Sequence, residues 1–328
     1  MDLWEVAVNG VVSAAEAEAG GLGPPALRTL QREGQLRRLI RGWYAVKPPL
    51  ENAPWEEPDP FARARFMHAL TTTALLRSFD GRVVASHYSA LALHGIDLWR
   101  SDLDTVQLQR VRDDHSRHRT GAVLHPAVGG DMQIEAAGGL ATVPVAQAVV
   151  ETGLLGAGAR DPTVMAFDAL VAADHALRLG LVTDEEIAAE LQRHKRHPGI
   201  VATRALLRHR DGRHESVGET RTAHLHRLLG IHSTPQVEVR VGSTSYLLDF
   251  VDDDDPIATE FDGLAKYTRM GKSATEVVLA EKRRETQVSD QTGIHFLRVV
   301  WPELDRPRVM GERYDQARAI VRRRRRAA

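Results

Sequence analysis

The sequence predicts an α+β protein of several domains. Its length of 328 residues exceeds what one typical hydrophobic core holds. The start of the chain combines short helices with a basic hairpin, whereas its last third contains the order helix, three strands, helix, strand. We therefore expect an N-terminal domain over residues 1–50, a linker over 51–60, a mixed α/β middle region over 61–211, a C-terminal domain over 212–312 and a basic tail over 313–328.

The composition is that of an ordinary globular protein, with 43% apolar and 27% charged residues. Since 43 basic residues balance 44 acidic ones, net charge does not indicate a partner. The absence of cysteine excludes disulfides, thiolate zinc sites and thiol catalysis. The sequence also lacks a long apolar run and a signal-peptide pattern at its start, so we expect a cytoplasmic protein without a membrane partner.

The N-terminal elements follow from capping and turn residues. A capping box at Ser13 and Glu16 opens a short helix, and Pro24-Pro25 fits the first turn of another. Alternation on both sides of Arg41-Gly42 is typical of a hairpin. Three helices and a basic hairpin in this order predict a winged helix-turn-helix. The expected elements are helices over Leu3–Val8, from Ser13 to Gly20 and over Ala26–Glu33, and a hairpin over Leu36–Val46.

Arginine dominates this segment. Between Pro24 and Tyr44 there are five arginines and one acidic residue, Glu33. Helical spacing gives Arg28, Gln31 and Arg32 a common exposed face, and their side chains suit phosphates and base edges. A solvated basic helix in a protein-contact module is the alternative. The candidate DNA-binding residues are Arg28, Gln31, Arg32, Arg37, Arg38 and Arg41.

The segment GLGPPALRTLQREGQLRRLIRGWYAV resembles the N-terminal domain of AbiEi-type antitoxins, in which a winged helix is followed by a basic hairpin that ends in an aromatic residue. Gly42-Trp43-Tyr44 occupies that place here, and Val83–Ile96 is similar to the segment that follows in the same family. The resemblance implies a transcriptional regulator that binds double-stranded DNA. It also implies a protein partner, either a cognate toxin or a second copy of the chain.

The middle region carries no chemical motif. We expect helices over Phe61–Arg77 and, from Pro144 onward, over four further segments, together with two strands. Ser86, His87 and His94 are interpreted as buried polar residues, and the region as a packing or dimerisation module. The expected strands are Leu103–Val111 and Ala122–Pro126, and the later helices are Val145–Leu155, Val164–Leu179, Asp184–His194 and Ile200–Arg210.

In the C-terminal domain three carboxylates are expected on one face of a sheet. A hairpin centred between Asp254 and Asp255 places Asp249 opposite Glu260, and period-2 alternation places Asp262 on the same face. Like charges directly opposite each other are destabilising, and a divalent cation removes the conflict. The expected elements are a helix over Glu219–Leu229, strands over Pro235–Val241, Tyr246–Val251 and Ile257–Asp262, a helix over Glu276–Gln291 and a strand over Ile294–Trp301.

This order resembles the core of PD-(D/E)XK phosphodiesterases, and the tail resembles the very-short-patch-repair-like endonucleases. The resemblance rests on Asp249-Phe250, Glu260-Phe261-Asp262-Gly263, Lys266-Tyr267, the run from Glu281 to Glu285 and the run from Arg298 to Trp301. It implies a restriction-endonuclease-like α/β/α fold in which Asp249 and Glu260 hold Mg²⁺. Asp262 stands at the position where that family has a lysine. The resemblance then implies that Lys266 or Lys282 takes the role of this lysine and stabilises developing negative charge. Asp262 itself would be a further metal ligand or would orient a water molecule.

Some alternatives stay open. Glu219 is either the third residue of a capping box or an outer metal ligand. The run Arg322–Arg326 is interpreted as a disordered arm that binds phosphate or aids solubility. For the whole chain we weigh a DNA-binding regulator with an inert nuclease-like domain against a Mg²⁺-dependent DNA endonuclease targeted by its winged helix.

Overall fold

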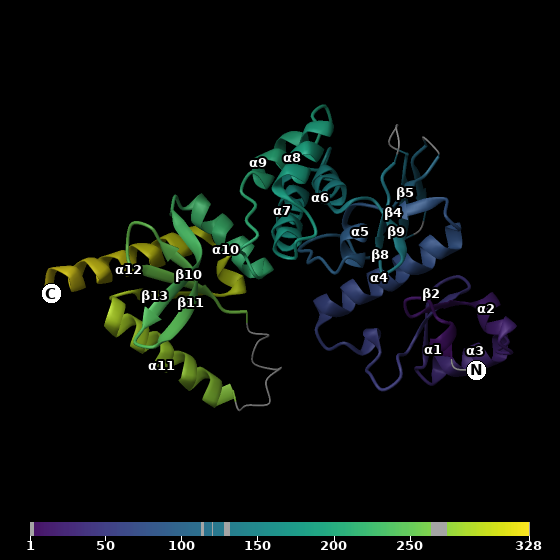
Figure 1. Ribbon diagram of the computed structural model, residues 1–328, viewed down its shortest axis with the longest axis horizontal. Coiled ribbons are helices and arrows are strands. Elements are labelled where there is room, and N and C mark those ends of the chain that lie inside the picture. The colour runs from purple at the N-terminus through teal and green to yellow at the C-terminus, as the bar shows by residue number, and fades with distance from the viewer. Residues whose placement is uncertain (1–2, 113–114, 120, 128–131, 264–273, 328) are drawn as a thin grey trace. The chain divides into compact units, whose positions relative to one another are not determined.

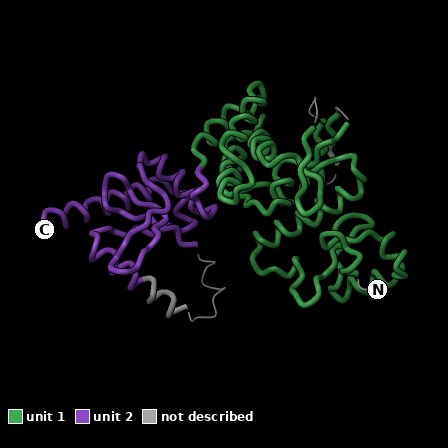
Figure 2. The backbone as a smooth tube through the Cα atoms, viewed as in Figure 1, with its two compact units in different colours: residues 1–210 green, residues 211–328 purple. Residues whose placement is uncertain are grey.

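A computed structural model describes residues 3–112, 115–119, 121–127, 132–263 and 274–327. The chain divides into two compact units, residues 1–210 and residues 211–328 (Figure 2). The predicted N-terminal domain and middle region both lie in the first unit, and the second unit begins one residue before the predicted C-terminal domain.

The first unit begins with three short helices and a small antiparallel sheet (Figure 1). The hairpin prediction is confirmed, since Leu36 pairs with Val46 and Gly42 turns the chain with a φ of 78°. The capping box at Ser13 is confirmed as well, and prolines fill the first turn of α3. A strand before Ser13 was not predicted. The elements are α1 (Leu3–Val6), β1 (Val11–Ser13), α2 (Ala14–Ala19), α3 (Pro24–Arg32), β2 (Leu36–Ile40) and β3 (Trp43–Val46), with strand order β1-β3-β2.

Helix α4 (Pro60–Phe79) packs against all three strands of this small sheet. Its Arg77 donates a hydrogen bond to the carbonyl of Val11 over 2.6 Å and forms an ion pair with Glu16. The same guanidinium lies 4.9 Å from the ring centroid of Trp43. The segment 51–60, predicted as a linker, contains a short 3₁₀ helix, η1 (Pro54–Glu56), whose Glu56 pairs with Lys47.

The rest of the first unit is a six-stranded mixed sheet followed by helices (Figure 1). The predicted helices are confirmed within a few residues, and so are the two predicted strands, now β5 and β7. The remaining short strands were not predicted. The elements are β4 (Val83–Ala85), α5 (His87–Leu93), β5 (Val106–Arg110), β6 (Arg117–Arg119), β7 (Ala122–His125), β8 (Glu135–Ala137), β9 (Leu140–Thr142), α6 (Val145–Leu154), α7 (Thr163–Arg178), α8 (Asp184–Arg193) and α9 (Ile200–Leu207).

The second unit is built on a four-stranded sheet of order β10-β11-β12-β13 (Figure 1). The first three strands are antiparallel, whereas β13 pairs with β12 in parallel after the helix α11. The predicted order of helix, three strands, helix and strand is confirmed. The elements are α10 (Val217–Leu228), β10 (Ser233–Val241), β11 (Thr244–Asp252), β12 (Ile257–Phe261), α11 (Ala274–Thr292), β13 (His295–Val299), η3 (Trp301–Glu303) and α12 (Pro307–Ala327).

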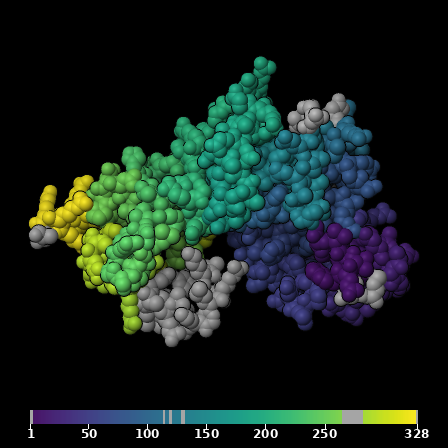
Figure 3. All heavy atoms as spheres, viewed as in Figure 1, coloured from purple at the N-terminus to yellow at the C-terminus, as the bar shows by residue number. Residues whose placement is uncertain are grey.

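The end of the chain corrects one prediction. The run Arg322–Arg326 is not a disordered arm, because it belongs to α12 and continues a helix that starts at Pro307. Met310, Tyr314, Ala317 and Val321 recur at helical spacing and are buried in the main core of the unit. The run of five consecutive arginines lies in the last turns of this helix, where their side chains are exposed at the surface of the unit (yellow in Figure 3).

Candidate nucleic-acid interface and polar row

The basic surface of the N-terminal segment lies on α3 and on the β2–β3 hairpin. Leu27 and Leu36 are turned into the core, which leaves the side chains of Arg28, Arg32 and Arg37 exposed. Arg38 and Arg41 are exposed on the hairpin as well. Among the described residues, none of these five arginines forms an ion pair with an acid. Five uncompensated cations on neighbouring elements form a surface suited to a polyanion.

Two of the predicted contact residues are partly engaged within the helix. The side-chain amide of Gln31 donates to the carbonyl of Leu27 over 3.2 Å, and Gln31 is only partly exposed. Arg32 donates to the hydroxyl of Thr29 over 2.9 Å. These local bonds orient the side chains on the helix surface and leave most of the guanidinium donors of Arg32 available. Trp43 serves a structural role, since it lies against Arg77 of α4.

In the second unit a polar row crosses the sheet. The pairs Phe250–Thr259 and Val251–Ala258 confirm the predicted hairpin register, and the next position in that register places Asp249 opposite Glu260. Glu260 in turn pairs with Arg298 of β13. On the other side, Gln236 is opposite Asp249 in the register of β10 and β11. We call Gln236, Asp249, Glu260 and Arg298 the polar row.

Gln236 has a strained backbone. Its φ of 54° is in the left-handed region, although it is neither a glycine nor in a turn. Its amide donates to Glu219 over 2.9 Å, which connects the row to the start of α10. The row therefore holds a residue in a conformation that costs free energy, at the place where the acidic side chains gather.

Glu219 corrects the predicted capping box in one detail. The hydroxyl of Ser216 accepts the Glu219 N–H at 3.2 Å, as expected, but the carboxylate of Glu219 accepts the backbone N–H of Glu215 instead of that of Ser216. It also accepts the Ser216 hydroxyl at 2.9 Å. Burial raises the pKa of Glu219, and the nearby negative charge of Asp249 raises it further. Glu219 thus lies beside the row with both oxygens hydrogen-bonded.

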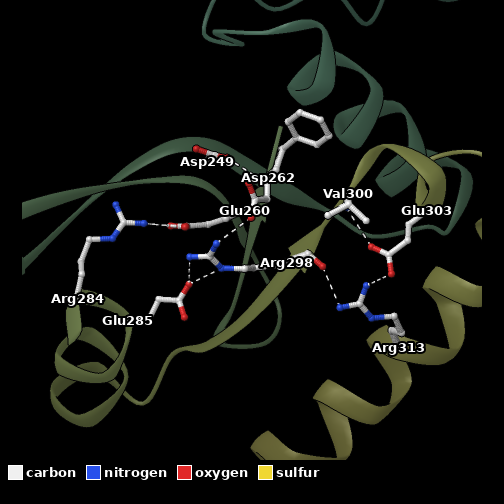
Figure 4. Close-up of polar contacts among 10 residues, drawn as sticks. Asp249, Glu260, Asp262, Arg284, Glu285, Arg298, Val300, Glu303 and Arg313 are labelled. Carbon is white, nitrogen blue, oxygen red and sulfur yellow. Dashed lines mark hydrogen bonds and ion pairs between the residues drawn. The ribbon is translucent and has the colours of Figure 1, made fainter. Parts of the chain in front are cut away.

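Two arginines compensate the acids (Figure 4). The Nη2 atom of Arg284, from α11, lies 2.6 and 2.7 Å from the two oxygens of Glu260. Arg298 contacts Asp262 at 3.1 Å and Glu285 at 2.6 Å. Burial is the main cause that raises the pKa of Glu260 to about 7, and Asp249 raises it further, whereas the Arg284 charge opposes the shift.

Of the two predicted lysines, only Lys282 lies in the described part of the chain, and no contact between it and these acids is seen there. Lys282 is exposed on α11, and Lys266 lies outside the described residues. Asp262 follows β12 and binds Arg298, while Asp249 accepts the backbone N–H of Phe261 at 2.8 Å. Within the described residues no group of three or more acids and histidines has the geometry of a metal site. Guanidinium and backbone donors engage Glu260, Asp262 and Asp249 in this arrangement, and Mg²⁺ stays a prediction.

Arg284 and Arg298 were missed by the sequence reasoning, although a signal existed for Arg284. It is four residues before Val288, which is fully buried, so helical spacing places both on the inward face of α11. For Arg298, the alternation of β13 puts it on the opposite face from the buried Leu297 and Val299, which is the face of Glu260.

The N-terminal segment is similar to a known protein family. Residues 5–47 match the family described as "Transcriptional regulator, AbiEi antitoxin". This match covers the helices and the hairpin that carry the exposed arginines, and it supports a role as a DNA-binding regulator. Within the described residues, every helix is too short or too polar to cross a membrane.

Similar chains come from mycobacteria. The uncharacterized proteins MT2308 and Rv2248 of Mycobacterium tuberculosis, from strains CDC 1551 and H37Rv, are each 28% identical over 270 residues, which is 75% of this chain and 88% of theirs. The crystal structure of the RV2827C protein from Mycobacterium tuberculosis is 18% identical, with a TM-score of 0.35, and covers 65% of this chain and 75% of that one.

Proposed function

We propose that this protein is a DNA-binding regulator of the AbiEi antitoxin type, and that residues 3–46 bind double-stranded DNA as a winged helix-turn-helix. The observation that carries the proposal is the match of residues 5–47 to that family, over the elements that expose Arg28, Arg32, Arg37, Arg38 and Arg41. In this arrangement α3 is the recognition helix and the β2–β3 hairpin is the wing.

The exposed side chains of α3 and those of the hairpin suit different parts of the DNA. Arg28 and Gln31 are three residues apart on α3, so they reach the same groove and can read base edges. The arginines of the hairpin are spread along a strand pair and a turn, a geometry that suits phosphates along the backbone. Since the family description includes antitoxins, the proposed regulator also has a toxin as a candidate protein partner.

A titration of labelled duplex DNA from the region upstream of the protein's own gene tests this proposal. We expect the double variant Arg28→Ala with Arg32→Ala to bind at least about tenfold more weakly at moderate salt. It should also reduce the slope of log K against log salt by about one, because a lost phosphate contact of Arg32 removes close to one unit, whereas Arg28 is assigned to base edges.

The matched control is Arg160→Ala with Arg196→Ala, which removes two exposed arginines of the same unit outside the N-terminal segment. Its affinity and salt slope should equal those of the wild type. If the control and the double variant bind DNA alike at every salt concentration, residues 3–46 are not the DNA-binding surface.

Metal-dependent DNA cleavage by the second unit is a second candidate function, because Asp249 is opposite Glu260 in the register of β11 and β12. Supercoiled plasmid incubated with Mg²⁺ or Mn²⁺ tests it, with Asp249→Ala and Glu260→Ala as variants. Cleavage by the wild type that both variants lose would favour an enzyme. Intact plasmid with either metal would leave the regulator as the function of the chain. The regulator is the better supported of the two, since Arg284 engages both oxygens of Glu260.

A further inference from the structure

We propose that the guanidinium of Arg284 occupies the cation position beside Asp249 and Glu260, so that the polar row is neutralised by the chain itself and excludes a divalent metal. The proposal concerns the second unit alone and does not rest on DNA binding by the N-terminal segment.

The contact between Arg284 and Glu260 has the geometry of a chelated cation. One nitrogen, Nη2, is 2.6 and 2.7 Å from the two carboxylate oxygens, so it lies on the bisector of the carboxylate. A metal bound in bidentate fashion by Glu260 would require the same two oxygens. Both charges are partly removed from water, since the side chains of Glu260 and Arg284 are 12% and 29% exposed. A guanidinium and a divalent ion cannot share this place, because two cations at such close range repel strongly.

The surrounding charges make a cation necessary at this position. Asp249 and Glu285 both act on Glu260 as neighbouring negative charges, and Arg298, the second nearby cation, is already divided between Asp262 and Glu285. Among the residues that the structure describes, Arg298 is the other cation that acts on Glu260, and it is shared with Asp262 and Glu285. Without Arg284, the region would have to take up a proton or an external cation.

The topology explains why an arginine of α11 reaches the row. Helix α11 is the crossover between the parallel strands β12 and β13, so its inward face covers the face of the sheet that carries Glu260 and Arg298. Lys282 and Arg283 are exposed, whereas Arg284 is half-buried and is directed at Glu260 (Figure 4). The rotation of α11 over the sheet, with Val288 buried on its inward face, thereby selects one of these three consecutive cations.

Binding of Mn²⁺ to the full chain tests the proposal, with free Mn²⁺ measured by its electron paramagnetic resonance signal and thermal stability measured in Mn²⁺ and in EDTA. Wild type is expected to bind no Mn²⁺ at the row and to melt at the same temperature in both solutions. Arg284→Met keeps the apolar length of the side chain and removes its charge. We expect it to gain one Mn²⁺ site, at least about tenfold tighter than any binding by the wild type, and a Tm that rises with Mn²⁺.

Two further variants make the result specific. Glu260→Gln combined with Arg284→Met should lose the acquired site, because the amide is a poor ligand. Arg283→Met, which removes the adjacent exposed cation, should behave as the wild type does. The proposal is overturned if wild type binds Mn²⁺ and Glu260→Gln abolishes that binding, or if Arg284→Met folds and binds no Mn²⁺. If Arg284→Met does not fold, Mn²⁺ binding by the wild type and by Glu260→Gln decides whether the proposal holds.

Discussion

Gly218 lies directly under the ring of Phe261. A Cβ atom placed on Gly218 would be 2.0 Å from Cε1 of that ring, far inside van der Waals contact. This close approach brings the first turn of α10 against β12, and the neighbouring Glu219 is thereby held beside Asp249 and Gln236. The glycine is therefore a packing requirement of the second unit rather than a turn residue.

We expect Gly218→Ala to destabilise the second unit by about 1–3 kcal/mol, because α10 or Phe261 has to move to admit the methyl group. Urea unfolding followed by circular dichroism measures the change. Gly311→Ala is the matched control, since a Cβ on Gly311 of α12 would meet Leu229 at an ordinary 3.4 Å. That variant should be neutral or more stable, as alanine favours helix. Equal effects of both variants would contradict the packing argument.

Arg77 connects α4 to the N-terminal sheet through a carbonyl, a carboxylate and an aromatic ring. Its replacement by alanine leaves the Val11 carbonyl without this donor, and we expect a loss of about 1–3 kcal/mol. Arg77→Lys should recover only part of it, because lysine lacks the planar fork that serves Val11 and Glu16 together. Denaturant unfolding of the full chain measures the free energy of unfolding of each variant. The exposed Arg160→Ala is the control and should change stability by less than about 0.5 kcal/mol. If Arg77→Ala were as stable as the wild type, Arg77 would not stabilise the packing of α4 on the N-terminal sheet.

The buried Glu151 of α6 makes the first unit sensitive to pH. Burial raises its pKa to about 7. Its Oε1 accepts from Gln147, and its Oε2 lies 3.6 Å from Nδ1 of His87 on α5. The charge of His194, at the end of α8, lowers this pKa, whereas that of Glu190 within α8 raises it. The folded protein therefore holds the Glu151 proton more tightly than the unfolded chain does. The free energy of unfolding consequently falls as pH rises from about 4.5 to 7, and the loss is complete above that.

Glu151→Gln is expected to remove this dependence. At pH 8 the variant should be more stable than the wild type by on the order of 2–3 kcal/mol, and at pH 5 the two should converge. Thermal unfolding across this pH range is the measurement. The exposed Glu185→Gln should follow the wild type at every pH. A pH-independent difference between Glu151→Gln and the wild type would show that titration of this carboxyl is not involved.

Tyr314 anchors the last helix through a buried polar chain. Its hydroxyl contacts Nε2 of His226 at 2.5 Å and the hydroxyl of Thr259, and His226 reaches Ser233 at 2.7 Å. Burial and the charge of Arg227 lower the pKa of His226 to about 3, so the ring is neutral and needs this partner. We expect Tyr314→Phe to cost about 1–3 kcal/mol, because His226 and Thr259 lose a partner in the core.

Urea unfolding at neutral pH measures that loss. Tyr246→Phe is the comparison and should have little effect, since the hydroxyl of Tyr246 makes an exposed contact with Gln287 at 3.3 Å. If the two phenylalanine variants were equally stable, the buried chain would contribute nothing to the anchoring of α12.

The sequence allowed more of the fold to be predicted than of the chemistry. Capping residues, prolines and alternation located α3, the β2–β3 hairpin and the strands of the second unit, because these signals are local. Strands of three residues such as β1 and β4 were missed, since so short a segment has no period to detect. Helix α12 was missed because its arginines obscured a buried stripe of widely spaced apolar residues.

Part of the polar row was predictable and part was not. The register that sets Asp249 opposite Glu260 follows from the position of the Asp-rich turn. The rotation of α11 over the sheet decides which of its cations forms an ion pair with those acids. That rotation is set by tertiary packing around Val288. Within the run Lys282-Arg283-Arg284, the helical spacing of Arg284 from Val288 is the signal that favours the third member. The sequence shows that Asp262 stands where the nuclease pattern has a lysine, whereas the contact of Arg284 with Glu260 comes from the structure.

The second unit cannot complete its hydrophobic core without α12. Its core needs Met310, Tyr314, Ala317 and Val321, which are supplied after every strand of the sheet has been synthesised. A recombinant fragment that stops at residue 312, the boundary that the sequence alone predicts, would leave Ile257, Phe261 and Leu297 uncovered. Such a chain is expected to aggregate, because transiently exposed apolar surface drives association. Residues beyond 312 therefore decide whether this half of the protein can be isolated in folded form.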